Sequence, residues 1–206
     1  MAMAPGRERV REARRQMYRQ LITDAAEAVF ADRGFGDAKM SDVAREAGVS
    51  LKTLYANFGG KVDLYRAIQQ VRHEEVMKLT EAVADGPALD VMMRRVVVGV
   101  EYLLDHPNFL RFNLREGNAW AVVSDPVVGD DVGHWMQVVR LEEEILQRGI
   151  DEGVFVDERP ELMSKMIRAL YQVQLADWVE RKRRGDREEL IALIQRYIKR
   201  LLCREA

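Results

Sequence analysis

The sequence predicts an all-α fold of about nine helices, with a small N-terminal head of three helices and a larger C-terminal helical body. Apolar residues recur at intervals of three and four in each long segment, which is the period of a helix with one buried face. No segment alternates apolar and polar residues between turn signals, as a strand would. With 206 residues, 48% of them hydrophobic, the chain can bury a sizeable core.

The first helix is predicted over residues 10–33, and Gly34 ends it. Residues 1–6 are expected to be disordered, because they are mostly small and include Pro5. The predicted core stripe of this helix comprises Met17, Leu21, Ala25, Val29 and Phe30, with Ile22 and Ala26 beside it.

The start of this helix is rich in arginine. Two carboxylates, Glu8 and Glu12, stand among six cations: Arg7, Arg9, Arg11, Arg14, Arg15 and Arg19. One interpretation is an ordinary solvated helix start. The other is a basic arm that lies along a DNA backbone or reaches a minor groove. Both interpretations stay open. The charge balance points to DNA more generally: residues 1–70 hold 12 Lys and Arg against 9 Asp and Glu, and the remainder holds 20 against 25, which fits a DNA-facing N-terminal head on an acidic body.

Two short helices joined by a glycine turn follow. Residues 41–47 carry apolar side chains at helical spacing, and Gly48 stands where a left-handed backbone is needed just past a helix end. Ser50 is a good N-cap for a second helix over residues 51–58, whose apolar side is Leu54 and Phe58. Two such helices around a three-residue turn have the sequence form of a helix-turn-helix.

The opposite face of the second helix is polar. Its members are Leu51, Lys52, Thr53, Tyr55, Ala56 and Asn57. A cation, a hydroxyl, a phenol and an amide are groups that donate to phosphate oxygens and base edges. By itself, however, the pattern also suits an ordinary solvated helical hairpin.

The string AREAGVSLKTLYANFGGK resembles the DNA-binding signature of the TetR family of bacterial transcriptional regulators. In that signature Ala-Gly-Val closes one helix, and Ser, Thr-Leu-Tyr, Phe and Lys follow at fixed spacing. The upstream AAEAVFADRGFGDAKMSDVA resembles the family's first helix, its Gly-Phe corner and the start of its second helix. The resemblance covers about residues 17–68, and it implies an N-terminal DNA-binding domain at 1–68 with a ligand-binding and dimerisation domain at 69–206.

Eight side chains of this region are expected to contact DNA, and of these Thr53, Tyr55 and Lys61 match the family pattern. Thr53, Tyr55 and Lys61 are predicted to dock to phosphates. Base edges in the major groove are assigned to Lys52, Ser41, Lys39 and Asn57, and Leu51 is placed against a thymine methyl group.

Three positions depart from the family pattern. Lys39 replaces a helix-capping Thr, so the cap is expected to fall to Asp37 or Ser41. Ala56 and Asn57 stand where larger aromatic or His side chains are common, which weakens the expectation of phosphate contacts there.

The fourth helix is predicted over residues 61–84, with apolar residues at Leu64, Ile68, Val71, Val76, Leu79 and Val83. Asp85-Gly86-Pro87 then breaks the pattern. Further helices are predicted over residues 89–105, 108–116, 130–152, 160–184 and 186–203.

The last two helices, within residues 160–203, carry apolar stripes that predict a partner. The first stripe comprises Met163, Met166, Ile167, Leu170 and Gln174; the second comprises Leu190, Ile194, Tyr197 and Leu201, flanked by Ile191, Ile198 and Leu202. These stripes could serve internal packing. The alternative, which the resemblance implies, is a homodimer through a four-helix bundle across a two-fold axis.

Large aromatic and flexible Met side chains in the body predict either plain core or an apolar pocket for a small-molecule effector. The candidates are Met92, Tyr102, Phe109, Phe112, Arg115, Trp120, Trp135, Met136, Tyr171 and Gln174. Residues 118–133 contain Pro and Gly and are expected to form a loop or broken helix that could serve as a portal.

The sequence gives little support for a metalloprotein or an enzyme. His73, His106 and His134 are widely separated, and Met77 stands where a zinc-protease helix would need its second His, so no metal or cofactor is expected. Glu142, Glu143 and Glu144 are consecutive on a predicted surface helix and cannot share one active-site direction. The chain is therefore not expected to be an enzyme.

The cellular location is expected to be the cytoplasm. Cys203 is the single cysteine, so no internal disulfide can form. No apolar run is long enough to cross a membrane, and the N-terminus lacks the apolar segment of a signal peptide.

The sequence therefore predicts a cytoplasmic, dimeric, ligand-responsive regulator that binds double-stranded DNA, with repression of a palindromic operator as the expected mode. The alternative is a helical protein-interaction module of the same fold that has lost sequence-specific DNA binding.

Overall fold

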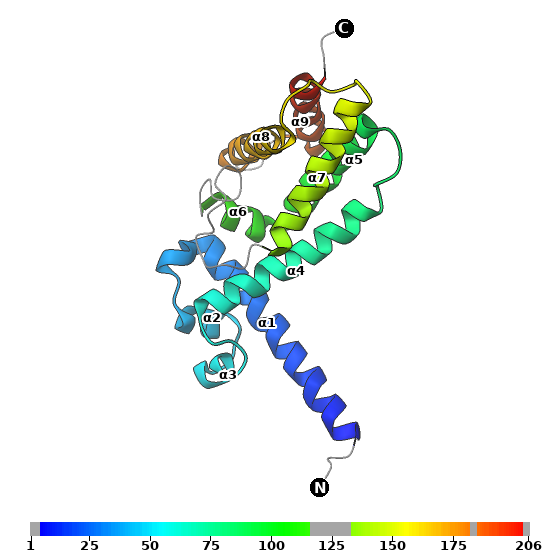
Figure 1. Ribbon diagram of the computed structural model, residues 1–206. Helices are drawn as coiled ribbons and strands as arrows, with labels where there is room; N and C mark the ends of the chain where they lie inside the picture. The colour runs from blue at the N-terminus through cyan, green and yellow to red at the C-terminus, as the bar shows by residue number, and fades with distance from the viewer. Residues whose placement is uncertain (1–4, 116–132, 182–184, 204–206) are drawn as a thin grey trace. The chain divides into compact units, whose positions relative to one another are not determined.

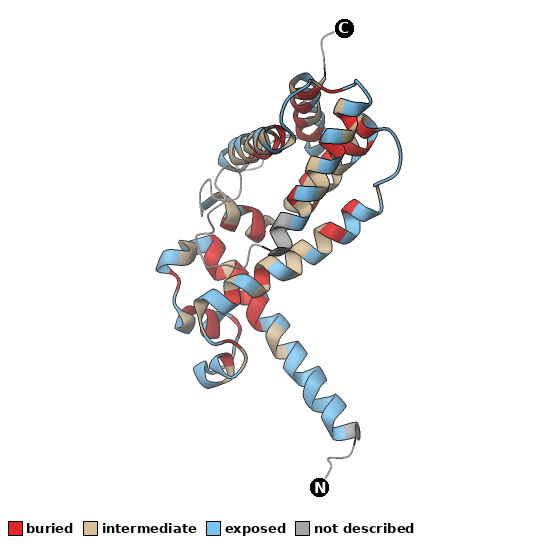
Figure 2. Cartoon of the chain, in the orientation of Figure 1, coloured by how far each residue is buried: buried red, intermediate tan, exposed pale blue. Residues whose placement is uncertain are grey.

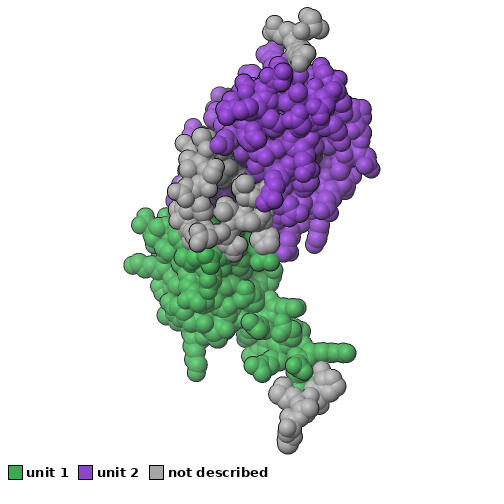
Figure 3. Space-filling view, viewed as in Figure 1, with its two compact units in different colours: residues 1–71 green, residues 72–206 purple. Residues whose placement is uncertain are grey.

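The computed structural model describes residues 5–115, 133–181 and 185–203; for residues 5, 6 and 133–136 only the backbone is described. These ranges contain nine α-helices, and the one pairing of extended segments among them is an isolated bridge between Phe155 and Cys203. The predicted all-α class is confirmed. The chain divides into two compact units, residues 1–71 and 72–206 (Figure 3).

Unit 1 contains α1 (Pro5–Asp37), α2 (Met40–Glu46), α3 (Leu51–Tyr55) and the first half of α4 (Lys61–Glu81) (Figure 1). Its core takes one stripe from each helix: Ile22, Ala26 and Phe30 from α1, Val43 from α2, Leu54 and Phe58 from α3 and the residues after it, and Leu64 and Ile68 from α4. Burial of these apolar side chains away from water stabilises the packing of the four helices.

The prediction that Met17 and Leu21 of α1 belong to the core is wrong. Met17 is 58% exposed and Leu21 is 44% exposed, whereas Ile22 and Ala26 are fully buried. The reason is geometric, since much of the N-terminal half of α1 projects beyond α2 and α3 (Figure 2).

The ends of α1 also differ from the prediction. Pro5 and Gly6, expected to be disordered, belong to the helix, and proline suits a first turn because its missing N–H has no helical acceptor there. At the other end Gly34 has φ 81°, a left-handed value that interrupts the helix, and helical structure resumes as far as Asp37.

The caps of α2 and α3 are only partly as expected. Lys39 is the N-cap of α2 and no side-chain hydrogen bond caps that helix, so the expectation that Asp37 or Ser41 replaces the usual Thr is wrong. Ser50 caps α3 as predicted. The helix ends at Tyr55 rather than Phe58, because the chain turns after the C-cap residue Ala56.

Unit 2 contains the second half of α4 and five further helices: α5 (Ala88–Asp105), α6 (Pro107–Arg115), α7 (Gly133–Asp151), α8 (Pro160–Glu180) and α9 (Arg187–Leu202). Their predicted positions agree to within a few residues, and α4 ends three residues earlier than predicted. The predicted portal at 118–133 lies outside the described residues except for Gly133, which begins α7.

The core of unit 2 lies where α5, α7, α8 and α9 pack on one another. Its fully buried members include Val96, Val100, Leu146, Ile167, Leu175, Ile194 and Ile198. Leu79, Met166 and Tyr197, predicted in apolar stripes, are instead 45%, 39% and 40% exposed. In the second half of α4 the buried positions are Met77 and Thr80, so the stripe turns away from Leu79.

None of the helices within the described ranges combines the length and the apolar character that crossing a membrane requires.

Candidate nucleic-acid interface

The turn between α2 and α3 is fixed by backbone geometry. Gly48 has φ 63°, a conformation that side chains rarely adopt, and the N–H of Val49 bonds the carbonyl oxygen of Ala44 at 2.9 Å. Ser50 Oγ accepts from the N–H of Thr53 at 3.0 Å. These backbone and cap contacts therefore determine the direction of α3, and they do not involve its outward-facing side chains.

The outward face of α3 is open. Leu51 and Tyr55 are 45% and 54% exposed, and Lys52 and Ala56 are exposed as well. The opposite face is closed, since Leu54 is fully buried and Phe58 is 3% exposed. The alternation between the two faces is the one that the spacing predicts.

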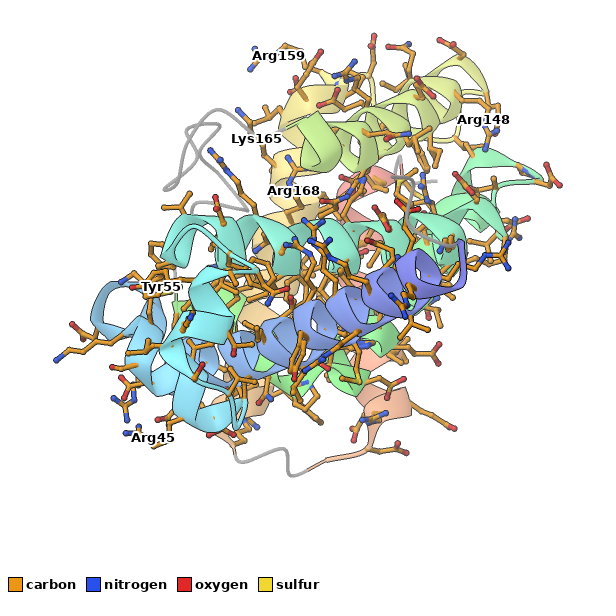
Figure 4. The ribbon with its side chains drawn as sticks, turned by 90° about the horizontal axis from the view of Figure 1, so that it is seen from below. Arg45, Tyr55, Arg148, Arg159, Lys165 and Arg168 are labelled. Atoms are coloured by element: carbon orange, nitrogen blue, oxygen red, sulfur yellow. The ribbon has the colours of Figure 1, made fainter. Side chains whose placement is uncertain are left out.

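The face of α2 adds Lys39 and Ser41, both exposed, and a residue that the sequence analysis missed. Arg45 is 71% exposed, and its guanidinium donates to Asp42 Oδ1 at 2.8 Å. Figure 4 labels Arg45 on α2 and Tyr55 on the neighbouring α3. The spacing in the sequence could have identified Arg45 as a candidate DNA contact, because it lies one turn after Ser41 and on the same side of the helix.

The buried carboxylate of Asp42 connects this face to α1. Its two oxygens accept from Arg33 at 2.7 Å and from Arg45 at 2.8 Å. An arginine from each helix therefore neutralises a carboxylate that burial would otherwise destabilise.

Two of the predicted contact residues already have partners within α3. Thr53 Oγ1 lies 2.9 Å from Ser50 Oγ, and the side-chain amide of Asn57 donates to the carbonyl oxygen of Thr53 at 2.8 Å. Both side chains are half-buried. They shape the ends of α3, and the donors that they can still offer to DNA are the Thr53 hydroxyl and the second amide N–H of Asn57.

Lys61, at the start of α4, is directed into unit 1. Its ammonium donates to the carbonyl oxygens of Gly36 at 2.8 Å and Ala38 at 3.1 Å, and it lies 4.7 Å from the centre of the Phe35 ring. An ammonium has three N–H groups. One donor therefore remains for a phosphate.

Arg19 has a role that the sequence analysis did not find. Its guanidinium donates to the carbonyl oxygen of Asn57 at 2.6 Å and lies 4.2 Å from the centre of the Phe58 ring. The residues are 38 positions apart in sequence, so no local pattern could reveal the pair. Arg19 satisfies a carbonyl left without a helical partner where α3 ends.

A row of arginines runs along α1 from this point: Arg7, Arg11, Arg15 and Arg19, at intervals of four. Each interval turns the side chain by only about 40° around the helix, so the row stays on one broad side and is about 18 Å long. Arg7, Arg11 and Arg15 are exposed. We call α3 the reading helix, because its exposed side chains are the ones expected to reach base edges. Arg19 touches the end of α3, so the row begins beside the reading helix.

The predicted ligand residues spread over several environments. Met92, Tyr102, Phe109 and Phe112 are buried, Tyr171 and Gln174 are half-buried, and Arg115 is exposed. Trp120 and the side chains of Trp135 and Met136 lie outside the described residues. None of the ten lines the hollow of about 430 Å³ between α5 and α9, whose lining is Glu101, Asp105, Gly185, Asp186, Arg187, Glu188 and Ile191.

Tyr102 belongs to a polar network on α4 and α5. Its O–H donates to Glu75 Oε2 at 2.5 Å, and Arg72 donates to the same oxygen at 3.0 Å. Burial and then the bond to Glu75 raise the pKa of Tyr102. Burial alone would raise the pKa of Glu75, but the two hydrogen bonds together with the charges of Arg72 and His106 hold that pKa below its ordinary value.

Metal binding gains no support from the parts of the chain that the structure describes, where no group of three or more His, Cys, Asp or Glu is arranged to hold an ion.

Comparison with known proteins singles out the N-terminal unit. Residues 22–68 match the family model described as bacterial regulatory proteins, tetR family. The HTH-type transcriptional activator FasR of Mycolicibacterium smegmatis is 41% identical over 70 residues, which cover 34% of this chain and 32% of FasR. The chain thus spans only a third of that relative's length.

Two further likenesses extend into unit 2. The HTH-type transcriptional repressor SCO4008 of Streptomyces coelicolor is 25% identical over 140 residues, 68% of each chain. The crystal structure of the regulator FadR from Bacillus subtilis in complex with stearoyl-CoA has the same fold, with a TM-score of 0.74 at 19% identity over 88% of this chain and 98% of that one. These relatives are transcriptional regulators, which are not enzymes.

Proposed function

This chain belongs to the TetR family of bacterial regulatory proteins by its residues 22–68, and from that premise we propose that it is a ligand-responsive transcriptional repressor. In this proposal a dimer binds a palindromic operator, and a small apolar or amphipathic molecule releases it. The protein acts in the cytoplasm and carries out no enzymatic reaction. Residues 1–68 bind DNA, and residues 69–206 bind the effector and the second subunit.

One observation supports this function most strongly. Leu51, Lys52 and Tyr55 are exposed on a helix whose other side is sealed by Leu54 and Phe58. A helix held this way can enter a major groove without any change in its own packing.

The contacts divide into two kinds. Lys52, Ser41, Lys39 and Asn57 read base edges and Leu51 packs on a thymine methyl group, whereas Tyr55 and Thr53 bind phosphates. The exposed guanidinium of Arg45 adds a phosphate contact. Lys61 acts mainly by holding the link between α1 and α2, with its third N–H directed to DNA.

The arginine row on α1 extends the contact beyond the reading helix. Arg7, Arg11 and Arg15 have no carbonyl or carboxylate partner among the described residues, so their guanidinium groups are available to phosphates. This favours the basic-arm interpretation over the ordinary helix start. Such contacts raise affinity for every sequence and make it depend on salt.

The second subunit packs on α8 and α9. Met166 and Val173 are 39% and 65% exposed on α8, and the interval of seven positions places both on one side of the helix. Tyr197 of α9 is 40% exposed. Dimerisation gives two reading helices, which meet half-sites about 34 Å apart.

The effector binds in unit 2. The buried side chains of Met92, Phe109 and Phe112 supply apolar surface, and Tyr102, Tyr171 and Gln174 supply polar groups near it. That FadR of Bacillus subtilis, a protein of the same fold, was solved with stearoyl-CoA supports an effector with an apolar tail.

A gel-shift assay with the DNA that flanks the protein's own gene tests the proposal. Salt-sensitive retention of a fragment containing an inverted repeat is expected, together with a dimer in sedimentation analysis. Lys52→Ala should weaken the specific complex, while the exposed Lys78→Ala, on α4 in unit 2, should leave it unchanged. Failure to retain any double-stranded DNA would leave the chain as a helical interaction module.

A further inference from the structure

A polar cluster lies among the apolar side chains of unit 2. Glu142 Oε2 on α7 accepts from Ser164 Oγ at 2.6 Å and from Arg168 Nη1 at 3.0 Å, and Arg168 also donates to Ser164. Ser164 is fully buried and Arg168 is 8% exposed. Glu142 keeps only 17% of its side-chain surface exposed, so its predicted place on a surface helix is wrong.

A second arginine belongs to the same cluster. Arg95 of α5 is half-buried, and the charges of Glu142 and Tyr171 act on it. It makes no hydrogen bond or ion pair to any other described residue. Burial lowers its pKa, which means that the protein supplies too little negative charge to compensate for lost water.

The cluster holds more hydrogen-bond donors than acceptors. Arg95 offers its five N–H groups, the O–H of Tyr171 has no acceptor within the described residues, and Arg168 Nε is buried without a partner. Against these donors stands one largely buried carboxylate, Glu142, whose Oε2 is already bound to Ser164 and Arg168. The half-buried Glu143 also interacts with Arg168, from a position that water reaches. Glu144, the other acid that acts on Arg95, is exposed and screened by water.

Apolar side chains and open space adjoin the cluster. Met92, one turn before Arg95, and Val139, one turn before Glu142, are buried. One turn after Arg95 on the same side of α5, a Cβ placed on Gly99 would meet no atom within 4 Å. The described residues therefore leave the surface of α5 at Gly99 uncovered.

We propose that Arg95 and Arg168 form an anion-binding site between α5, α7 and α8, and that the effector is an amphipath whose carboxylate or phosphate head binds there while its apolar tail lies along Gly99 and Met92. Figure 4 labels Arg168, the member of the pair that comes from α8. The inference rests on the proposed function, because it names the effector class of the same ligand-binding unit. The charge of the site determines which head group binds. Two guanidinium groups and one buried carboxylate leave a net positive charge, which an anionic head group neutralises and a cationic head group does not.

Calorimetric titration of the full-length protein without DNA tests the site. The probes are decanoate, decyl phosphate and decanol, which have the same tail and differ in the head. We expect at least one anionic probe to bind at least about tenfold more tightly than decanol, since charge-assisted bonds are the stronger kind. The stronger of the two anionic probes identifies the head group.

Two variants and a matched control complete the test. Arg95→Gln should weaken the anionic probe by about tenfold or more and leave decanol unchanged, while Arg94→Gln, at the neighbouring exposed position of α5, should change neither. Gly99→Leu should weaken all three probes by filling the space for the tail. Equal binding of decanol and the anions, or unaltered anion binding in Arg95→Gln, would overturn the proposal.

The result is independent of DNA binding. Anion binding by a protein that retains no DNA would refute the proposed function and keep the site. Operator binding with no preference for anions would do the reverse.

Discussion

Arg19 and Asn57 join the longest helix of unit 1 to the end of its reading helix, through a 2.6 Å hydrogen bond from the guanidinium to the backbone carbonyl oxygen. The same guanidinium lies over the Phe58 ring at 4.2 Å. Because α3 has only five residues, contacts of this kind, rather than helix propensity, determine where its outward side chains point.

Arg19→Met should lower the free energy of unfolding by about 1–3 kcal/mol, because it removes a charge-assisted hydrogen bond and a cation–π contact. Operator affinity should fall on all sequences alike. Urea unfolding followed by circular dichroism measures the first effect and gel shifts the second. Arg9→Gln, at an exposed position without a polar partner in the part of the chain that the structure describes, is the control, and equal stability of the two variants would contradict the role given to Arg19.

Lys61→Met should also lower the free energy of unfolding, by about 1–2 kcal/mol, because the carbonyl groups of Gly36 and Ala38 lose their donor. A lysine that served only to bind phosphate would leave stability unchanged on replacement. Lys52→Met, which alters an exposed lysine of α3, provides that comparison in the same urea titration.

Lys52→Ala and Tyr55→Phe should affect DNA binding differently. Loss of the Lys52 ammonium should relax preference at one base pair, whereas loss of the Tyr55 hydroxyl should weaken binding to all sequences, since phosphates carry no sequence information. Binding to a set of operators with single base changes separates the two effects. Uniform losses for both variants would refute the assignment.

Arg11→Gln should reduce the slope of log affinity against log salt by about one, because one phosphate contact is lost. Arg9 is the matched control: it is on the same helix and also exposed, but lies about 200° around the helix from Arg11 and outside the row. If the two variants gave the same slope, the row would have no special part in binding DNA.

Tyr102→Phe should raise the pKa of Glu75 toward its ordinary value, about 4.3, because the variant removes a hydrogen bond to the carboxylate. With its pKa depressed in the fold, Glu75 stabilises the protein above its unfolded-state pKa, and this contribution disappears as the pH falls through the lower folded-state value. Carbon-13 NMR titration of the Glu75 carboxyl group measures the shift, and an unchanged pKa would count against the network.

Local sequence patterns predicted the helices well, including the turn at Gly48, the cap at Ser50 and the burial of Leu54 and Phe58. Each of these depends on residues within one or two turns. The missed features depend on distant partners. Lys61 was predicted to bind a phosphate and Arg19 to belong to a solvated helix start or a basic arm, because nothing near them in sequence shows the carbonyl groups that they bind.

Burial of side chains was predicted less well where a helix extends beyond the helices that pack against it. Met17 and Leu21 have the spacing of core residues, yet α1 projects past the helices that would cover them. Glu142 shows the opposite error, since three consecutive acids suggest a solvated surface while Ser164 and Arg168, more than twenty positions later, hold the first of them inside unit 2.

The brevity of α3 has a consequence for how such a protein can diverge. Contacts on its buried side and at its two ends hold it in position, through Leu54, Phe58, Ser50 and Arg19. None of these contacts involves the side chains at 51, 52, 55 or 56. Mutations at those four positions can therefore accumulate at little cost in stability. A duplicated gene copy could acquire a new set of target promoters while its architecture stayed intact.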